Sequence, residues 1–169
     1  HSCLHDALPI TDASYGKFVQ LVWLISRRKK AIRMKYAVLG SGAMGLRFGV
    51  LLQEAGFEVD FVDTWDKQLS TIRSQHGVYV SRDGQNKHLV PINVYSPEEY
   101  DGRADIQIVF TKQYMLAELL DRCAHFFNDK HYALTCMNGM GHIEKLNQYF
   151  APEHVIGGTA MIGTVLNKA

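Results

Sequence analysis

Residues 36–45 read Tyr-Ala-Val-Leu-Gly-Ser-Gly-Ala-Met-Gly, and the expected fold follows from this segment. Its first four residues form an apolar, partly β-branched run that is typical of a buried parallel strand. Gly40, Gly42 and Gly45 then complete a G-x-G-x-x-G spacing. This spacing is weak by itself because ordinary turns also use glycine. The elements on either side of the loop therefore decide whether it holds a nucleotide.

A helix and a second strand are expected after the glycines. Apolar residues recur there at helical intervals, namely at Met44, Phe48, Leu51, Leu52 and Ala55. Gly56 stands where a left-handed C-terminal cap is expected. The next strand, 58–62, ends on Asp63, which lies 18 residues after Gly45. Strand, glycine loop, helix, strand and acidic residue in this order predict a dinucleotide site.

Each glycine has a physical role in such a site. Gly40 permits the tight turn, Gly42 lets a diphosphate approach the backbone, and Gly45 allows close packing of the helix on the sheet. The helix N-terminus offers unpaired N–H groups and partial positive charge to the phosphates. The predicted phosphate-binding residues are Gly40, Ser41, Gly42, Ala43, Met44 and Gly45.

Asp63 is the predicted ribose-binding residue. A carboxylate at this position can accept hydrogen bonds from both ribose hydroxyls and would repel a 2′-phosphate. The expected cofactor is therefore NAD(P)H, with NADH favoured over NADPH. Lys67 is close enough in sequence to weaken this preference.

Composition indicates one globular domain with a sizeable core, because 47% of the 169 residues are hydrophobic and 21% are charged. The net charge of +1 gives no general electrostatic reason to expect nucleic acid or an anionic membrane as a partner. Cys3, Cys123 and Cys136 fall in no metal or redox spacing, so we expect no metal site and a cytoplasmic location.

Residues 1–33 do not share this pattern, and we expect them to be a non-native or disordered leader before a domain that covers 34–169. The apolar run 18–25 is too short to span a bilayer, and the basic cluster 27–30 follows it instead of preceding it. Met34 directly precedes the first strand and is the expected natural start. An amphipathic partner helix is the alternative for this segment.

The rest of the chain alternates between strands and helices, which predicts a doubly wound, mostly parallel α/β sheet of the Rossmann type. Lys112 and Asn138 each follow a predicted strand, so with Gly40 and Asp63 they are expected at one rim of the sheet. The expected elements are a helix over 65–75, a hairpin over 77–92 with an Asp-Gly turn, a helical turn at 97–100, a strand over 105–110, a helix over 116–126, a strand over 131–137, a helix over 143–150 and a strand over 155–160.

Three motifs in order, Val38 to Gly45, Thr111-Lys112 and Asn138-Gly139-x-Gly141, resemble the N-terminal domain of the ketopantoate reductase (2-dehydropantoate 2-reductase) family. The resemblance implies hydride transfer from NAD(P)H to the ketone of ketopantoate. It implies that Lys112 is the family's cofactor-side lysine and that Asn138 contacts the substrate and the nicotinamide ribose, which makes both candidate catalytic residues. A cation or an amide donor there would stabilise charge developing on the ketone oxygen.

The resemblance also implies a helical C-terminal domain with a general-acid lysine and a substrate-binding glutamate. We expect that domain to be absent from this chain, the chain to be inactive alone, and the full-length form to be a possible homodimer. Three departures stand out. Family members that use NADPH place a basic residue near the end of the second strand, where this chain has Asp63. Gln113, Tyr114 and Met115 replace the family's Ala, aromatic and Gln after the lysine, which puts the contacts of that Gln in doubt. His142 is expected to face solvent or cap a helix.

Three alternatives stay open. The first is an NAD-dependent reductase of another branched 2-keto acid, the second a non-catalytic NAD-binding module, and the third a methyltransferase that uses S-adenosylmethionine. The sequence has no P-loop lysine after the glycines, no G-x-S-x-G and no H-E-x-x-H motif. Thermal shifts with NADH, NADPH and S-adenosylmethionine would separate these classes.

Overall fold

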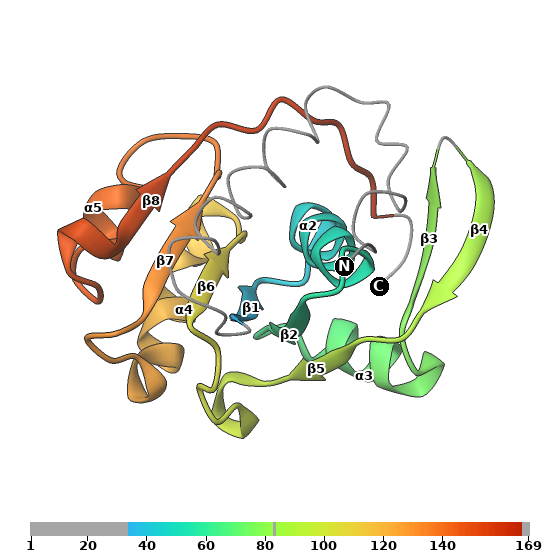
Figure 1. Cartoon of the computed structure of the whole chain (residues 1–169), viewed down its shortest axis with the longest axis horizontal. Coiled ribbons are helices and arrows are strands. Elements are labelled where there is room, and N and C mark those ends of the chain that lie inside the picture. The colour runs from blue at the N-terminus through green and yellow to red at the C-terminus, as the bar shows by residue number, and fades with distance from the viewer. Residues whose placement is uncertain (1–33, 83, 167–169) are drawn as a thin grey trace, which may run out of the picture. The chain divides into compact units, whose positions relative to one another are not determined.

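A computed structural model describes residues 34–82 and 84–166. Within these residues, parallel strands form a six-stranded sheet in the order β5-β2-β1-β6-β7-β8 (Figure 1). This order is that of a Rossmann-type doubly wound sheet, and it confirms the predicted fold class. The strands are β1 (Lys35–Leu39), β2 (Glu58–Val62), β5 (Asn93–Tyr95), β6 (Ile106–Val109), β7 (Tyr132–Thr135) and β8 (Val155–Gly157).

The strand order reverses between β1 and β6. The chain builds outward from β1 through β2 to β5, and then returns to place β6 on the free side of β1. Leu39 at the end of β1 pairs with Val109 at the end of β6 and with Val62 at the end of β2. Loops that leave these strands therefore meet at one rim, which is where ligands bind in open parallel sheets.

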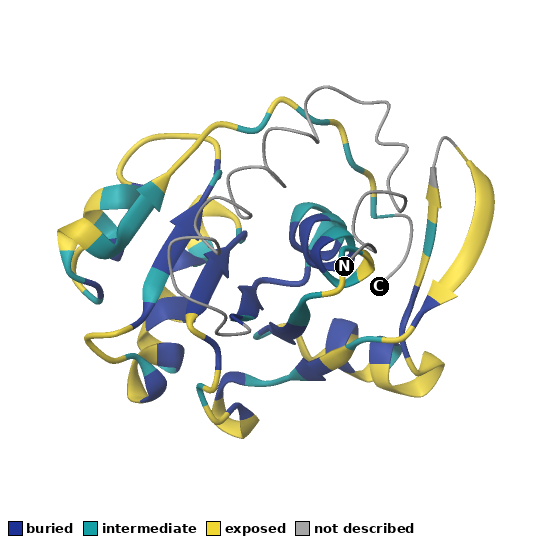
Figure 2. Ribbon diagram, in the orientation of Figure 1, coloured by how far each residue is buried: buried dark blue, intermediate teal, exposed yellow. Residues whose placement is uncertain are grey.

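Helices cover both faces of the sheet, whose central strands are buried (Figure 2). Val38 and Phe61 lie against Gly49 of α2 on one face, whereas Ala37 and Leu39 belong to a core cluster with α4 on the other. The helices are α2 (Ala43–Glu54), α3 (Asp66–Gln75), α4 (Leu116–Cys123) and α5 (His142–Leu146), and the short 3₁₀ turns are η1 (Pro97–Glu99), η2 (Gln113–Met115), η3 (Ala124–Phe126) and η4 (Pro152–His154).

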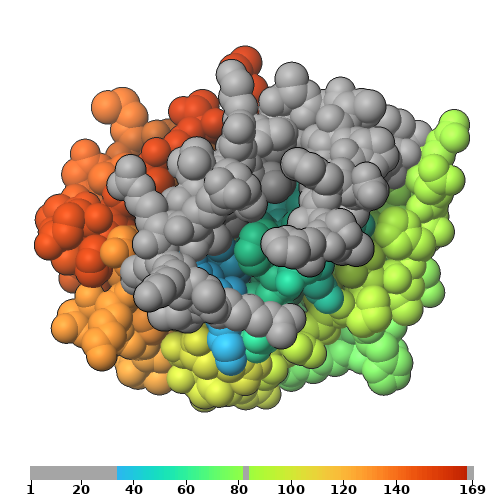
Figure 3. All heavy atoms as spheres, in the orientation of Figure 1, coloured from blue at the N-terminus to red at the C-terminus, as the bar shows by residue number. Residues whose placement is uncertain are grey.

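The predicted hairpin is confirmed as β3 (Val78–Arg82) and β4 (Gln85–Val90), which pair antiparallel in a separate small sheet. Gly84 in its turn has φ +72°, a left-handed value that favours glycine. Asp83, the other residue of the expected turn, lies outside the described residues. The hairpin and the α5–β8 region lie at opposite sides of the space-filling view (Figure 3).

Several boundaries differ from those expected. The third strand of the parallel sheet is β5, which directly follows the hairpin and was not predicted as a strand of its own. The helix expected over 143–150 ends at Leu146, because Gln148 and Tyr149 donate to carbonyls only three residues back. The strand expected over 155–160 ends at Gly157.

The proposed leader, 1–33, lies outside the described residues, all of which belong to the unit that begins at Met34. Among the described residues, none of the helices has the length and apolar character needed to cross a bilayer.

Candidate functional site

The glycine loop between β1 and α2 is built from backbone contacts that exclude side chains. Gly40 has φ +103°, and a Cβ placed on it would lie 2.4 Å from the carbonyl oxygen of Phe110. A Cβ on Gly45 would lie 1.9 Å from the carbonyl oxygen of Gly40. Both distances are far inside van der Waals contact, so only glycine fits at either position. The roles predicted for these two glycines in turning and close packing agree with this geometry.

Gly42 is different, because a Cβ on it would meet no described atom within 4 Å. Gly42 is also the N-cap of α2 and has no side chain to satisfy the first amide groups of the helix. The N–H groups of Ala43, Met44 and Gly45 have no intrahelical acceptor by helix geometry. The room beside Gly42 and the unpaired amides at the positive end of the helix together fit a diphosphate group.

Asp63 closes the loop from the end of β2. Its carboxylate is buried, with 7% of the residue exposed. Oδ2 accepts hydrogen bonds from the backbone N–H of Ser41 at 2.5 Å and from the Ser41 hydroxyl at 2.6 Å. Oδ1 accepts one from the backbone N–H of Trp65 at 2.9 Å. The residue predicted to bind ribose thus also fixes the glycine loop.

Gln68 is a loop anchor that the sequence interpretation missed. Its side chain is buried on α3, and Nε2 donates to the carbonyl oxygen of Ser41 at 2.9 Å. Ser41 is therefore fixed through its amide, hydroxyl and carbonyl. A signal was available in the sequence, since Gln68 shares the buried face of α3 with Leu69 and Ile72, and a buried polar group on such a face needs a partner.

Lys112 and Asn138 follow the neighbouring strands β6 and β7, and both are exposed. Lys112 is the N-cap residue of η2. The next residue, Gln113, donates from Nε2 to the carbonyl oxygen of Met140 at 2.9 Å. This hydrogen bond joins the Lys112 loop to the Asn138 loop.

The structure places all four predicted groups at the carboxyl ends of parallel strands: the glycine loop after β1, Asp63 after β2, Lys112 after β6 and Asn138 after β7. Of these four groups, Asp63 and the glycine loop are joined by hydrogen bonds between described residues. The roles of these residues in binding and catalysis stay predictions.

A cavity of about 440 Å³ lies beside Asn138, with His142 and Thr159 in its lining. His142 is buried, with 9% exposed, and makes no side-chain cap at α5. The expectation that it faces solvent or caps a helix is therefore wrong. Its Nδ1 has no hydrogen-bond partner among the described residues. His142 lines this cavity together with Gly157 at the end of β8 and with Gly158.

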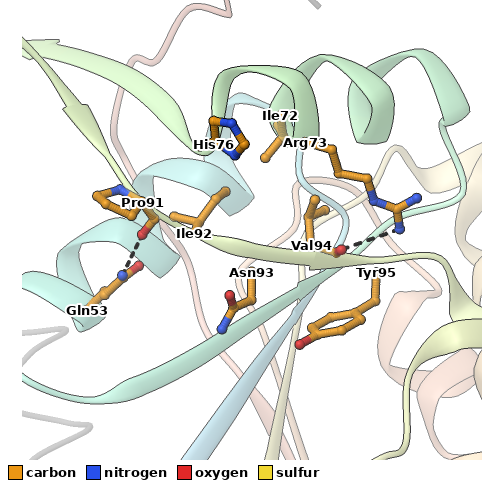
Figure 4. Close-up of a pocket in the computed structure, with 9 residues that line it drawn as sticks. All are labelled: Gln53, Ile72, Arg73, His76, Pro91, Ile92, Asn93, Val94 and Tyr95. Atoms are coloured by element: carbon orange, nitrogen blue, oxygen red, sulfur yellow. Dashed lines mark hydrogen bonds between the residues drawn. The ribbon is translucent and has the colours of Figure 1, made fainter.

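A larger cavity of about 570 Å³ is lined by residues of α3 and β5 (Figure 4). It is bounded by Asn93 at the amino end of β5 and by His76 after the last turn of α3. Gln53 also lines the cavity, and its Nε2 donates to the carbonyl oxygen of Pro91 at 2.7 Å. Because the amino ends of parallel strands face away from the glycine loop, this cavity is not the predicted coenzyme site.

The two described cysteines do not support thiol chemistry. Burial raises the pKa of Cys123 to about 12, and burial also raises the pKa of Cys136. The thiolate is the nucleophilic form, and it is scarce at neutral pH when the pKa is raised. Within residues 34–82 and 84–166, no group of three His, Cys, Asp or Glu residues is placed to hold a metal ion.

Comparison with known proteins agrees with this architecture. The family described as ketopantoate reductase PanE/ApbA matches residues 36–169. The 2-dehydropantoate 2-reductase of Streptococcus pyogenes serotype M3 is 33% identical over 119 residues, which are 70% of this chain and 38% of that protein. The enzyme of the same name from Lactococcus lactis is 28% identical over 130 residues, which are 76% of this chain and 41% of that protein.

Among solved structures, a D-mandelate dehydrogenase in complex with NADH and anilino(oxo)acetate is 28% identical, with a TM-score of 0.75. The match covers 80% of this chain and 43% of that one. The chain thus spans about two fifths of the length of the curated relatives it matches. With a family match that begins in β1 and continues through every later strand of the sheet, the chain belongs to the ketopantoate reductase family.

Proposed function

We propose that this chain is the coenzyme-binding part of a 2-keto acid reductase, with ketopantoate as the first candidate substrate and pantoate as the product. The observation that carries the proposal is the rim, where the glycine loop, Asp63, Lys112 and Asn138 follow four neighbouring strands of one parallel sheet. Membership of the family supports the same reaction class.

The residues of the loop would hold the coenzyme. The first amides of α2 would bind the diphosphate, for which Gly42 leaves open space. Asp63 would accept a hydrogen bond from the adenosine ribose. The bound nicotinamide would supply the hydride, and this chain would fix where that hydride is presented.

Lys112 and Asn138 would act on the substrate side of the rim. A lysine ammonium there can attract the carboxylate of a 2-keto acid or a coenzyme phosphate. The Asn138 amide can donate to a hydroxyl or to the ketone oxygen without titrating. In the longer protein we expect Asn138→Ala to lower kcat by about 100-fold, the loss measured when one oxyanion donor is removed. An unchanged kcat would contradict this role.

NADH is the proposed coenzyme in preference to NADPH. Asp63 brings a negative charge to the position where NADPH carries its 2′-phosphate. The structurally similar D-mandelate dehydrogenase was solved with NADH, which supports the same preference here. Measuring Kd of this chain for NADH and for NADPH tests this preference directly.

A second substrate class has a specific observation in its favour. The D-mandelate dehydrogenase structure has a TM-score of 0.75 with this chain, so a reductase of other branched or aromatic 2-keto acids is the alternative. Comparing kcat/KM for ketopantoate with that for the 2-keto acid of mandelate separates the two. The substrate with the higher kcat/KM is the better candidate for the physiological one.

The experiment that tests the coenzyme proposal is a titration of this chain with NADH, followed by fluorescence energy transfer from tryptophan. We expect saturable binding and, because the chain spans about two fifths of its relatives, no measurable ketopantoate reduction by residues 34–169 alone. Absence of binding would overturn the proposal, and robust turnover would overturn the expectation that a further domain is needed. We also propose a homodimer for the longer protein, which sedimentation would test.

A further inference from the structure

We infer that the Ser41 hydroxyl competes with the adenosine ribose for the Asp63 carboxylate and so lowers the affinity for NADH. The inference rests on the proposed function, because it concerns the same coenzyme. Ser41 would then have a role besides phosphate binding, because its hydroxyl determines how many acceptor sites of the Asp63 carboxylate are free for the ribose.

The argument begins with the acceptor capacity of Asp63. An ionised carboxylate offers about four lone-pair sites. Within the described part of the chain, three hydrogen bonds already use it, from the N–H of Ser41, the hydroxyl of Ser41 and the N–H of Trp65. About one site is left for a ribose diol, whereas recognition of both hydroxyls needs two.

Ser41 cannot bind the ribose in place of Asp63. Its exposed fraction is 0%, so a ligand at the rim does not reach its hydroxyl. Its hydroxyl bond to Oδ2 is 2.6 Å long, and a hydrogen bond to a charged acceptor is among the stronger ones in proteins. The ribose must therefore do without this acceptor site or displace the hydroxyl from it.

The loop does not depend on this hydroxyl for its backbone conformation. The Ser41 N–H bond to Asp63 and the Gln68 bond to the Ser41 carbonyl oxygen both involve backbone atoms of Ser41. Replacing the side chain with alanine keeps both bonds and adds no atom to a fully buried position. Ser41→Ala thus removes the competitor and leaves the loop in place.

The test measures Kd for NADH and NADPH with this chain and its variants. We expect Ser41→Ala to lower Kd for NADH by about 5-fold to 10-fold, as gaining one hydrogen bond to a charged group allows. Kd for NADPH should change less, because its 2′-hydroxyl is replaced by a phosphate. Ser41→Cys, whose thiol is a weaker donor, should give a Kd for NADH between those of the unmodified chain and of Ser41→Ala. This variant tests the inference if the alanine variant folds poorly.

Two controls make the result specific. Ser74→Ala is the matched substitution on the exposed side of α3, where the hydroxyl bonds only the carbonyl oxygen of Thr71, and it should leave Kd unchanged. In an Asp63→Ala background, Ser41→Ala should have no effect, because no carboxylate remains to be released.

The outcomes separate the two proposals. If the unmodified chain does not bind NADH, the proposed function fails, and this inference fails with it. If the unmodified chain binds NADH but Ser41→Ala binds it equally or more weakly, only the inference fails. Weaker binding would show that the hydroxyl orients the carboxylate for the ribose. An equal gain in the Asp63→Ala background would also overturn it.

Discussion

The two halves of the rim are built in opposite ways. Around β1 and β2, Ser41 and Asp63 are buried and share two hydrogen bonds, and Gln68 adds a third to the same loop. Around β6 and β7, Lys112 and Asn138 are exposed, and the Gln113 side chain donates from the first of their loops to the Met140 carbonyl oxygen in the second. The polar side chains of the first half are thus bonded to one another inside the protein, whereas those of the second half face solvent.

The difference fits the two tasks proposed for the rim. A diphosphate is recognised mainly by backbone amides at a helix terminus, and such a cradle works best when its geometry is fixed in advance. A site that closes over a substrate needs exposed side chains that reach their final contacts only on binding. The comparison predicts that substitutions that disrupt the close contacts of the first half change stability and coenzyme affinity together. Those in the second half should change affinity with little change in stability.

The largest effect is expected for Gly45→Ala. Its Cβ would lie 1.9 Å from the carbonyl oxygen of Gly40, so α2 must move away from the end of β1. We expect the free energy of unfolding to fall by about 3 kcal/mol and NADH binding to be lost. Urea denaturation and NADH titration measure both. A variant with normal stability and affinity would show that the close contact is not needed.

Asp63→Ala should have the next largest effect. It removes the ribose acceptor and leaves the Ser41 N–H without its partner. We expect Kd for NADH to rise about 30-fold, as loss of hydrogen bonds to a charged group allows, and Kd for NADPH to rise less. Equal changes for the two coenzymes would overturn the proposed preference for NADH.

Gly42→Ala should separate binding from stability within the same loop. A Cβ there meets no described atom within 4 Å, so the free energy of unfolding should change by less than about 0.5 kcal/mol. The methyl group would occupy the space proposed for the diphosphate, and we expect Kd for NADH to rise about 10-fold. It is the matched control for Gly45→Ala, and an unchanged Kd would place the diphosphate elsewhere.

Gln113→Met should give the smallest effect and tests the second half. It removes the bond from Nε2 to the Met140 carbonyl oxygen and keeps a side chain of similar length. We expect Kd for NADH to rise about 3-fold, with the free energy of unfolding lowered by no more than about 1 kcal/mol. Gln148→Met, on the exposed segment after α5, is the control. A large decrease in the free energy of unfolding would contradict the expectation that substitutions in this half change stability little.

Features that depend on residues close together in the sequence could be predicted, whereas features that depend on contacts between distant segments could not. The β1 run, the glycine spacing and the alternation of Glu58–Val62 are read from neighbouring residues, and β2 was predicted with its exact observed bounds. β5 was not, because Asn93–Tyr95 is only three residues long and directly follows the hairpin. Its pairing with β2, which makes it a strand, is a contact between segments far apart in sequence.

The same division runs through the site. The sequence alone determined the strand–glycine loop–helix unit, the acidic residue at the end of the next strand and the family, because short-range sterics and hydrogen-bonding needs dictate those residue types. Only the tertiary structure decided that Asp63 is already bonded to Ser41, that Gln68 fixes the loop and that His142 is buried. These facts depend on which side chains packing brings together across the sheet, and the order of residues along a chain does not specify those distances.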